Sequence, residues 1–115
     1  MHRFDKTRRL LKKSEYDHVF SQAKKWVTPE FIILYRDNIM GSARLGLAIS
    51  KKMIAKAHDR NRIKRILREA FRTHTRLPAI DIIVLARPGT GKANQSTLVE
   101  KLSAAWNKLS DSYGK

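Results

Sequence analysis

The residues with the clearest chemical potential lie in one segment, DRNRIKRILREAF at 59–71, which Arg72 follows. Placed on a helix at roughly 100° per residue, its apolar and basic side chains occupy neighbouring sides. Guanidinium groups bind phosphate through paired hydrogen bonds, and Asn61 can hydrogen-bond a base edge or a 2′-hydroxyl. The pattern therefore predicts a rigid rod that docks by its apolar side and presents cations to a nucleic acid. The apolar set is Ile63, Ile66, Leu67, Ala70 and Phe71, and the polar set is Arg60, Asn61, Arg62, Lys64, Arg65 and Arg68.

The basic side carries a row of like charges at i, i+4 spacing, formed by Arg60, Lys64, Arg68 and Arg72. Each such pair disfavours a helix by roughly 0.2–0.5 kcal/mol. The only acidic residue after the start of the helix, Glu69, is expected to point away from the middle of this row. The helix therefore needs an apolar contact to hold it and an external polyanion to neutralise it, although a solvated charged face is the common alternative.

Three aromatic residues can complete a nucleic-acid site. Tyr16 and Phe20 are one turn apart in a predicted helix, and Tyr35 lies in a predicted strand. Each can stack on an unpaired base. Aromatic residues at such spacing more often pack in a core, so both interpretations stay open on the residues alone.

The sequence contains no motif that brings together the side chains a catalytic site needs. The four histidines have no metal-site spacing, and the ten acidic residues are scattered. The loop PGTGKA at 88–93 lacks the four-residue gap of a phosphate-binding loop and has Ala93 where Ser or Thr is required. We therefore predict no catalytic residue and no metal site in this chain, and expect another component to perform any reaction it serves.

The charge of the chain is concentrated in two segments. The formal net charge is +15, with a sequence pI near 10.7. Residues 50–76 carry ten basic and two acidic residues, net +8, and residues 1–25 carry eight and three, net +5. This distribution favours a localised surface for a polyanion over general solubility.

Length and composition predict a single domain over residues 1–115 with one modest core. The longest apolar run, at 82–86, is far shorter than the ~20 residues of a membrane-spanning helix. No signal peptide is visible, and the absence of cysteine fits a reducing compartment. We expect a cytoplasmic protein with no membrane association.

Three helices are predicted from their capping residues and apolar stripes. Ser14, with Asp17, is expected to begin the first. Asp59 is expected to begin the basic helix. Thr97, with Glu100, is expected to begin the last, whose stripe is Leu98, Leu102, Ala105, Trp106 and Leu109.

Strands are predicted at 31–36, 43–50 and 80–86, and residues 22–27 form either a further short strand or none, so the order is α-β-β-β-α-β-α or has one strand fewer. The segment at 80–86 is almost continuously apolar, as in a central strand covered on both sides. The segment at 43–50 alternates, and one of its faces carries small residues that leave the backbone open to a close neighbour. These small residues are Gly46, Ala48 and Ser50.

Four segments together resemble the protein subunit of bacterial ribonuclease P. The most specific is HDRNRIKRILREAFR at 58–72, which resembles the "RNR" signature of that family. RLGLAISKK at 44–52 precedes it, and RLLKKSEYDHVF at 9–20 and DIIVLAR at 81–87 occur in the expected order. The resemblance spans nearly the whole chain.

The resemblance implies an α/β fold, a two-layer α-β sandwich in the order α-β-β-β-α-β-α. Its four-stranded sheet would contain a left-handed β-α-β crossover, where the general rule alone predicts a right-handed one. It also implies that the partners are the catalytic RNA subunit of ribonuclease P and the 5′ leader of precursor tRNA. That RNA, with the magnesium it requires, would cut the leader from the tRNA, while the protein would bind no cofactor and no small-molecule substrate.

The family's RNA-binding positions carry over to this chain one by one. The single-stranded leader is expected in a cleft between sheet and helices, with the small face of 43–50 as its floor and Tyr35 facing it. The implied RNA-binding residues are Tyr16, Phe20, Tyr35, Lys51, Lys52, Arg60, Asn61, Arg62, Lys64, Arg65 and Arg68.

Three other functions are compatible with the basic helix. A structural RNA-binding protein of the ribosomal type would share its charge and size. A stand-alone nuclease is disfavoured by the scattered acidic residues and histidines. A helix that enters the major groove of duplex DNA is the third.

Overall fold

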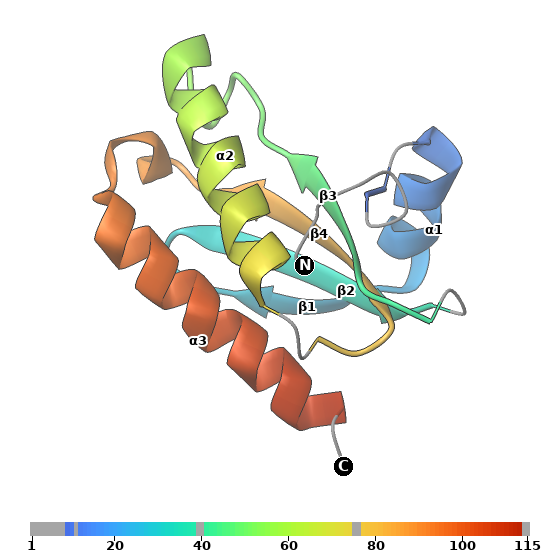
Figure 1. Cartoon of the computed structure of the whole chain (residues 1–115). Helices are drawn as coiled ribbons and strands as arrows, with labels where there is room; N and C mark the ends of the chain where they lie inside the picture. The colour runs from blue at the N-terminus through green and yellow to red at the C-terminus, as the bar shows by residue number, and fades with distance from the viewer. Residues whose placement is uncertain (1–8, 11, 39–40, 75–76, 114–115) are drawn as a thin grey trace.

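The computed structural model describes residues 9–10, 12–38, 41–74 and 77–113 (Figure 1). Their order confirms the predicted α-β-β-β-α-β-α arrangement, with one short 3-10 helix added before the last helix. The elements are α1 (Lys13–Gln22), β1 (Lys24–Val27), β2 (Phe31–Asp37), β3 (Arg44–Ala48), α2 (Ala57–Thr73), β4 (Ile80–Ala86), η2 (Thr90–Lys92) and α3 (Gln95–Tyr113).

The four strands form one mixed sheet in the order β1-β2-β4-β3. β2 pairs antiparallel with both β1 and β4, whereas β3 and β4 are parallel. In Figure 1, β3 and β4 point the same way and α2 crosses in front of the sheet between them, which makes the β3-α2-β4 crossover left-handed, as the resemblance implied. The apolar strand β4 has a strand on either side, as predicted.

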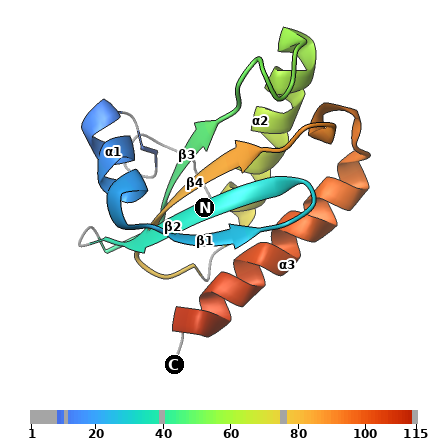
Figure 2. The same cartoon turned by 180° about the vertical axis from the view of Figure 1, so that it is seen from behind.

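The two faces of the sheet are covered unequally. α2 and α3 pack on one face and form with it the two-layer sandwich, whereas α1 lies on the opposite face (Figures 1 and 2). The main core lies between the sheet and the α2–α3 layer, where the rings of Phe71 and Trp106 meet edge to face at 6.2 Å. A small second cluster beneath α1 contains Leu10, Val19 and Ile83.

Both apolar stripes predicted for the long helices are confirmed. In α2 the buried residues are Ile63, Ile66, Leu67 and Phe71, and Ala70 is half-buried. In α3 they are Leu98, Leu102, Ala105, Trp106 and Leu109. No helix in the described ranges is both long and apolar enough to cross a membrane.

The predicted start of α1 is wrong by two residues. Ser14 lies inside the helix, and Lys12 is the N-cap residue. The backbone N–H of Lys12 donates to Oε1 of Glu15 at 2.9 Å, so Glu15 satisfies the first amide from within the helix. Asp17 instead accepts a hydrogen bond from Lys13 at 2.8 Å. The N-cap is Lys12 and not Ser14 because Glu15, which accepts the first amide, also has an ion-pair partner on the sheet, Arg44.

The other two helices also begin before their predicted caps. The N-cap residue of α2 is Lys56, and Asp59 lies in the first turn, where its charge is favourable for the helix dipole. The start of α3 is capped by Asn94, not Thr97, because Asn94 Oδ1 accepts the backbone N–H of Ser96 at 2.9 Å.

We expect Leu102→Ala to reduce the free energy of unfolding by roughly 2–5 kcal/mol, because it leaves a cavity in the core between α3 and the sheet. Val99→Ala on the same helix is the matched control. Val99 is 40% exposed, so its truncation should change stability by less than about 0.5 kcal/mol. Urea unfolding of both variants measures the difference, and equal losses would contradict this description of the core.

Candidate nucleic-acid interface

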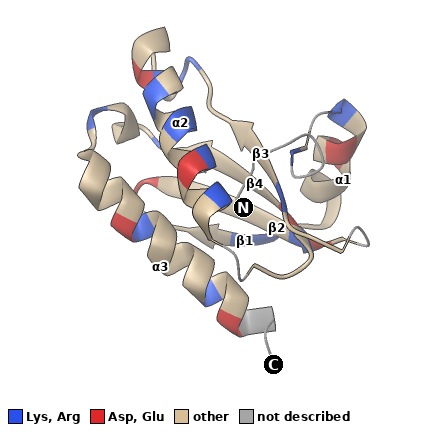
Figure 3. Cartoon of the chain, viewed as in Figure 1, with Lys and Arg blue, Asp and Glu red and all other residues tan. Residues whose placement is uncertain are grey.

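The Lys and Arg positions of α2 are spread along the length of the helix (Figure 3). Asn61, Arg65 and Arg68 are exposed, and Lys64 is half-buried. The ion pairs of the described residues include none with Lys64, Arg65 or Arg68. The middle of the predicted cationic row is therefore without acidic partners in the part of the chain that the structure describes.

Two of the predicted cations bind the chain's own backbone. Arg60 Nη1 donates to the carbonyl oxygens of Ile54 at 3.1 Å and Ala55 at 2.8 Å. Arg62 Nη2 donates to two carbonyl oxygens of the loop around η2, at 3.1 and 2.7 Å. These two residues fasten the loops at the start of α2, a role that the sequence analysis missed.

The end of the row is also neutralised. Glu69, expected to point away from the middle of the basic row, forms an ion pair with Arg72 at the end of the row. Residues three apart on a helix are neighbours on its surface, so this pair leaves the middle of the row without an acidic partner in the described residues. Arg72 was not among the predicted RNA-binding residues, so the predicted set keeps its central cations.

Lys64 and Arg68 meet Tyr16 in a hollow of about 240 Å³ between α1, α2 and the edge strand β3. The N-terminal segment closes one wall, since the N–H of Leu10 donates to the carbonyl of Leu45 at 3.0 Å. The hollow is lined by Arg9, Leu10, Tyr16, Leu45, Leu47, Lys64 and Arg68.

A second hollow of about 460 Å³ adjoins the first and shares Leu47 and Lys64 with it. Ser50 lies at its rim, and Lys51 and Lys52 follow in an exposed turn. The two hollows together are called the β3 groove below. The second is lined by Ile32, Leu47, Ala48, Ile49, Ser50, Met53, Lys64, Leu85 and Ala86.

Tyr16 explains the small residues of β3. A Cβ atom at Gly46 would lie 2.8 Å from the Tyr16 ring, so only glycine admits the ring against the strand. The Leu47 N–H, on the free edge of β3, donates to the Tyr16 hydroxyl oxygen at 3.1 Å. Tyr16 therefore covers part of the predicted small face, and Ala48 and Ser50 line the groove beyond it.

Phe20 projects from α1 one turn after Tyr16, and its side chain is 47% exposed. Because residues four apart share one side of a helix, both aromatic residues lie on the same side of α1. Val27 on β1 is another exposed large apolar residue. Phe20 lines neither hollow, so its exposed ring lies on α1 outside the groove.

Tyr35 does not lie on this side of the sheet. It shares its strand face with Phe31 and Ile33, which are buried in the main core against α2 and α3. Leu34 is the β2 residue that packs beneath α1. The expectation that Tyr35 faces the cleft is corrected by the alternation of β2, which was readable from the sequence.

A buried charge network fixes α1 on the sheet. Arg44 donates from Nε and Nη2 to the two carboxylate oxygens of Asp81, each at 2.8 Å. Its Nη1 donates to Glu15 Oε2 at 2.9 Å, while the other oxygen of Glu15 holds the first amide of α1. The hydrogen bond with Asp81 raises the pKa of Arg44. Asp81 is 2% exposed, so the geometry of the network is fixed by the surrounding core.

This network is not predicted from the sequence, although one signal for it is present. Asp81 stands near the start of the otherwise apolar strand β4, and a buried carboxylate requires a partner. A second link to α1, from Arg36 to the carbonyl oxygen of His18 at 2.7 Å, left no comparable signal. Among the described residues, no group of three or more His, Asp or Glu side chains could hold a metal ion.

Comparison with known proteins identifies the family. The ribonuclease P family model matches residues 4–110. The chain belongs to the ribonuclease P protein family. It is 61% identical over the full length of both chains to the ribonuclease P protein component of Legionella pneumophila.

Solved structures of ribonuclease P proteins have the same fold. The protein from Thermotoga maritima is 30% identical with a TM-score of 0.77, covering 87% of this chain and 96% of that one. The protein from Staphylococcus aureus is 27% identical with a TM-score of 0.78, covering 89% and 94%. This chain is thus a protein subunit of ribonuclease P, whose partners are the RNA of that enzyme and precursor tRNA.

We expect Asp81→Asn to reduce the free energy of unfolding by roughly 3–5 kcal/mol, because it leaves Arg44 without its main buried counter-charge. Asp17→Asn is the matched control, since the pair between Lys13 and Asp17 is largely exposed and its loss should not be measurable. Urea unfolding at neutral pH compares them. Equal stability of the two variants would show that the Arg44 network does not hold α1 on the sheet.

Proposed function

We propose that the β3 groove binds the single-stranded 5′ leader of precursor tRNA, while the exposed remainder of α2 contacts the catalytic RNA. The observation that carries this proposal is the meeting of Tyr16 with Lys64 and Arg68 in one hollow. A single strand is bound by stacking surfaces for its bases and cations for its phosphates, and this groove offers both. Phe20 adds a second exposed stacking surface on the same side of α1.

The remaining predicted residues receive distinct roles. Asn61 and Arg65 are exposed on α2 and contact the catalytic RNA, and Lys51 and Lys52 extend the positive surface at the end of the groove. Arg60 and Arg62 hold the adjoining loops and can use their other N–H groups for RNA. Tyr35 is withdrawn from the leader site because it lies on the opposite face.

The chemical step is assigned to the RNA partner and its magnesium ions. The protein contributes affinity for precursor over mature tRNA, because only the precursor has a leader to bind. Its positive surface also reduces phosphate repulsion between the two RNAs, which lowers the magnesium concentration that they require. The protein itself binds no cofactor in this proposal, and it acts in the cytoplasm.

Two competing functions are separated by simple experiments. One structural neighbour is a Staphylococcus aureus mutant described as having defective mRNA degradation activity, with a TM-score of 0.82. If this chain were a nuclease by itself, the purified protein would cut RNA in the absence of the catalytic RNA; we expect no cleavage. If it were a structural protein of the ribosomal type, its depletion would leave tRNA 5′ ends correctly processed; we expect leader-carrying precursors to accumulate.

The leader site predicts a selective defect in Phe20→Leu. Losing one stacked base should weaken binding of leader-carrying tRNA to the reconstituted holoenzyme by about tenfold. Leaderless tRNA is the internal control and should bind unchanged. Equilibrium binding at fixed salt measures both substrates. If wild-type holoenzyme binds the two tRNAs equally, the leader site is wrong.

Removing the central cations should raise the magnesium requirement. We expect the double variant Arg65→Gln, Arg68→Gln to bind RNA more weakly and to lose about 0.7 from its salt slope for each single-strand phosphate contact removed. Lys92→Gln with Lys101→Gln removes the same charge from exposed positions on η2 and α3. Magnesium titrations of cleavage compare the variants, and identical midpoints for both double variants would refute a local role for α2.

A further inference from the structure

The structure contains a second aromatic hollow, on the other face of the sheet from α1. It has a volume of about 530 Å³ and opens between the edge strand β1, its neighbour β2 and the C-terminal half of α3. Neither the family nor the leader proposal gives it a role. Its lining residues are Trp26, Tyr35, Lys108, Leu109 and Asp111.

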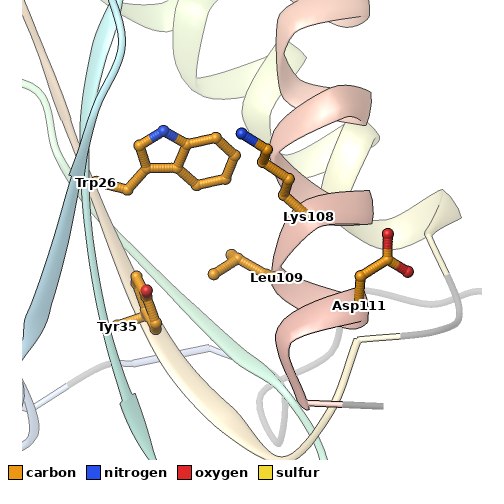
Figure 4. A pocket seen from close by; sticks show the side chains of 5 residues that line it. All are labelled: Trp26, Tyr35, Lys108, Leu109 and Asp111. Carbon is orange, nitrogen blue, oxygen red and sulfur yellow. The ribbon is translucent and has the colours of Figure 1, made fainter. Parts of the chain in front are cut away.

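The lining combines two stackable rings with a cation. Trp26 and Tyr35 are half-buried, and both pack against the core and line the hollow. Lys108 Nζ lies 5.3 Å from the centre of the Trp26 ring, within the range of a cation–π contact. Figure 4 shows Lys108 reaching toward the indole from α3, Leu109 beside Tyr35, and Asp111 directed away from both rings.

The strand register places the two rings on the same face of the sheet, since Trp26 pairs with Ile33 and Tyr35 is its diagonal neighbour. Figure 4 shows the indole and the Tyr35 ring at different angles, with Leu109 reaching toward the space between them. The Trp26 ring on the side of Lys108 is therefore the stacking surface, and Tyr35 forms a wall of the hollow.

We propose that this hollow, named here the Trp26 pocket, binds one unpaired nucleotide of RNA. Its base stacks on the Trp26 ring, and Lys108 leaves that ring to bind the attached phosphate. An RNA nucleotide is the occupant that fits a chain of net charge +15 with RNA partners. The site is independent of leader binding, because it lies at the β1 edge of the sheet and the β3 groove lies at the opposite edge.

The two tryptophans of the chain make the test direct. In ¹⁵N–¹H spectra of the full-length protein, each gives one indole N–H signal. Titration with 5′-AMP should shift the Trp26 signal saturably. The Trp106 signal should stay in place, because that side chain is 1% exposed in the core. Inorganic phosphate at equal ionic strength should not reproduce the shift; if it does, the pocket binds only anions and the proposal fails.

Variants separate stacking from folding. Trp26→Leu should weaken 5′-AMP binding by at least about fivefold, whereas Trp26→Phe keeps a ring and should retain most of it. Lys108→Gln should weaken 5′-AMP but not adenosine, which lacks the phosphate. Binding by Trp26→Leu with unchanged affinity, or no saturable Trp26 shift at millimolar 5′-AMP, would overturn the proposal.

The reconstituted holoenzyme distinguishes this site from the leader site. Trp26→Leu should preserve the preference for leader-carrying over leaderless tRNA, since it leaves the β3 groove intact. Loss of that preference in Trp26→Leu would refute the independence of the two sites. If the wild-type holoenzyme bound leader-carrying and leaderless tRNA equally, only the proposal for the leader site would be refuted. The binding of 5′-AMP to the Trp26 pocket is measured separately and would not be affected.

Discussion

The packing of the apolar side of α2 on the sheet is the interaction on which the rest of the structure depends. Ile63, Leu67 and Phe71 are fully buried against β3, β4 and α3. Burial of three such side chains contributes on the order of 5–9 kcal/mol, far more than the few tenths per pair that like charges on α2 cost. The helix can therefore keep Lys64, Arg65 and Arg68, which form no ion pair within the described residues, and can present them to an external polyanion.

Charged groups in this protein fall into two classes with different physical roles. Arg44, Arg60 and Arg62 are satisfied by buried or backbone oxygens of the chain, and they fix where elements and loops lie. The central cations of α2 have no ion-pair partner in the described residues, and the proposed function assigns them to RNA. Every guanidinium offers the same five N–H donors. The oxygens around it therefore decide whether it holds elements of the chain in place or stays available to a ligand.

The sheet divides the molecule into two surfaces of different character. On one face, α1 covers only part of the strands, and the β3 groove opens beside it at the β3 edge, where α2 of the other face supplies Lys64 and Arg68. On the other face, α2 and α3 bury most of the strands but leave the rings of Trp26 and Tyr35 partly open at the β1 edge. A one-residue shift along β2, from Leu34 to Tyr35, moves a side chain from one surface to the other.

The periodicity of the sequence was enough to determine the elements and most of the core. The stripes of α2 and α3, the central place of β4 and the charge on one side of α2 all follow from local spacing, because side-chain direction repeats every 3.6 residues in a helix and every two in a strand. The side of the sheet on which Tyr35 lies was equally readable from its alternation with Phe31 and Ile33.

Only the tertiary structure decided which cations are free and where α1 sits. Arg62 reaches carbonyl oxygens about thirty positions away, and Arg44 bridges Glu15 and Asp81 from two different elements. The start of α1 could not be predicted from the sequence either, because Glu15 accepts hydrogen bonds from the distant Arg44 as well as from the first amide of its own helix. Such contacts depend on how distant elements of the chain pack against each other, and the local spacing of residues in the sequence does not encode that packing.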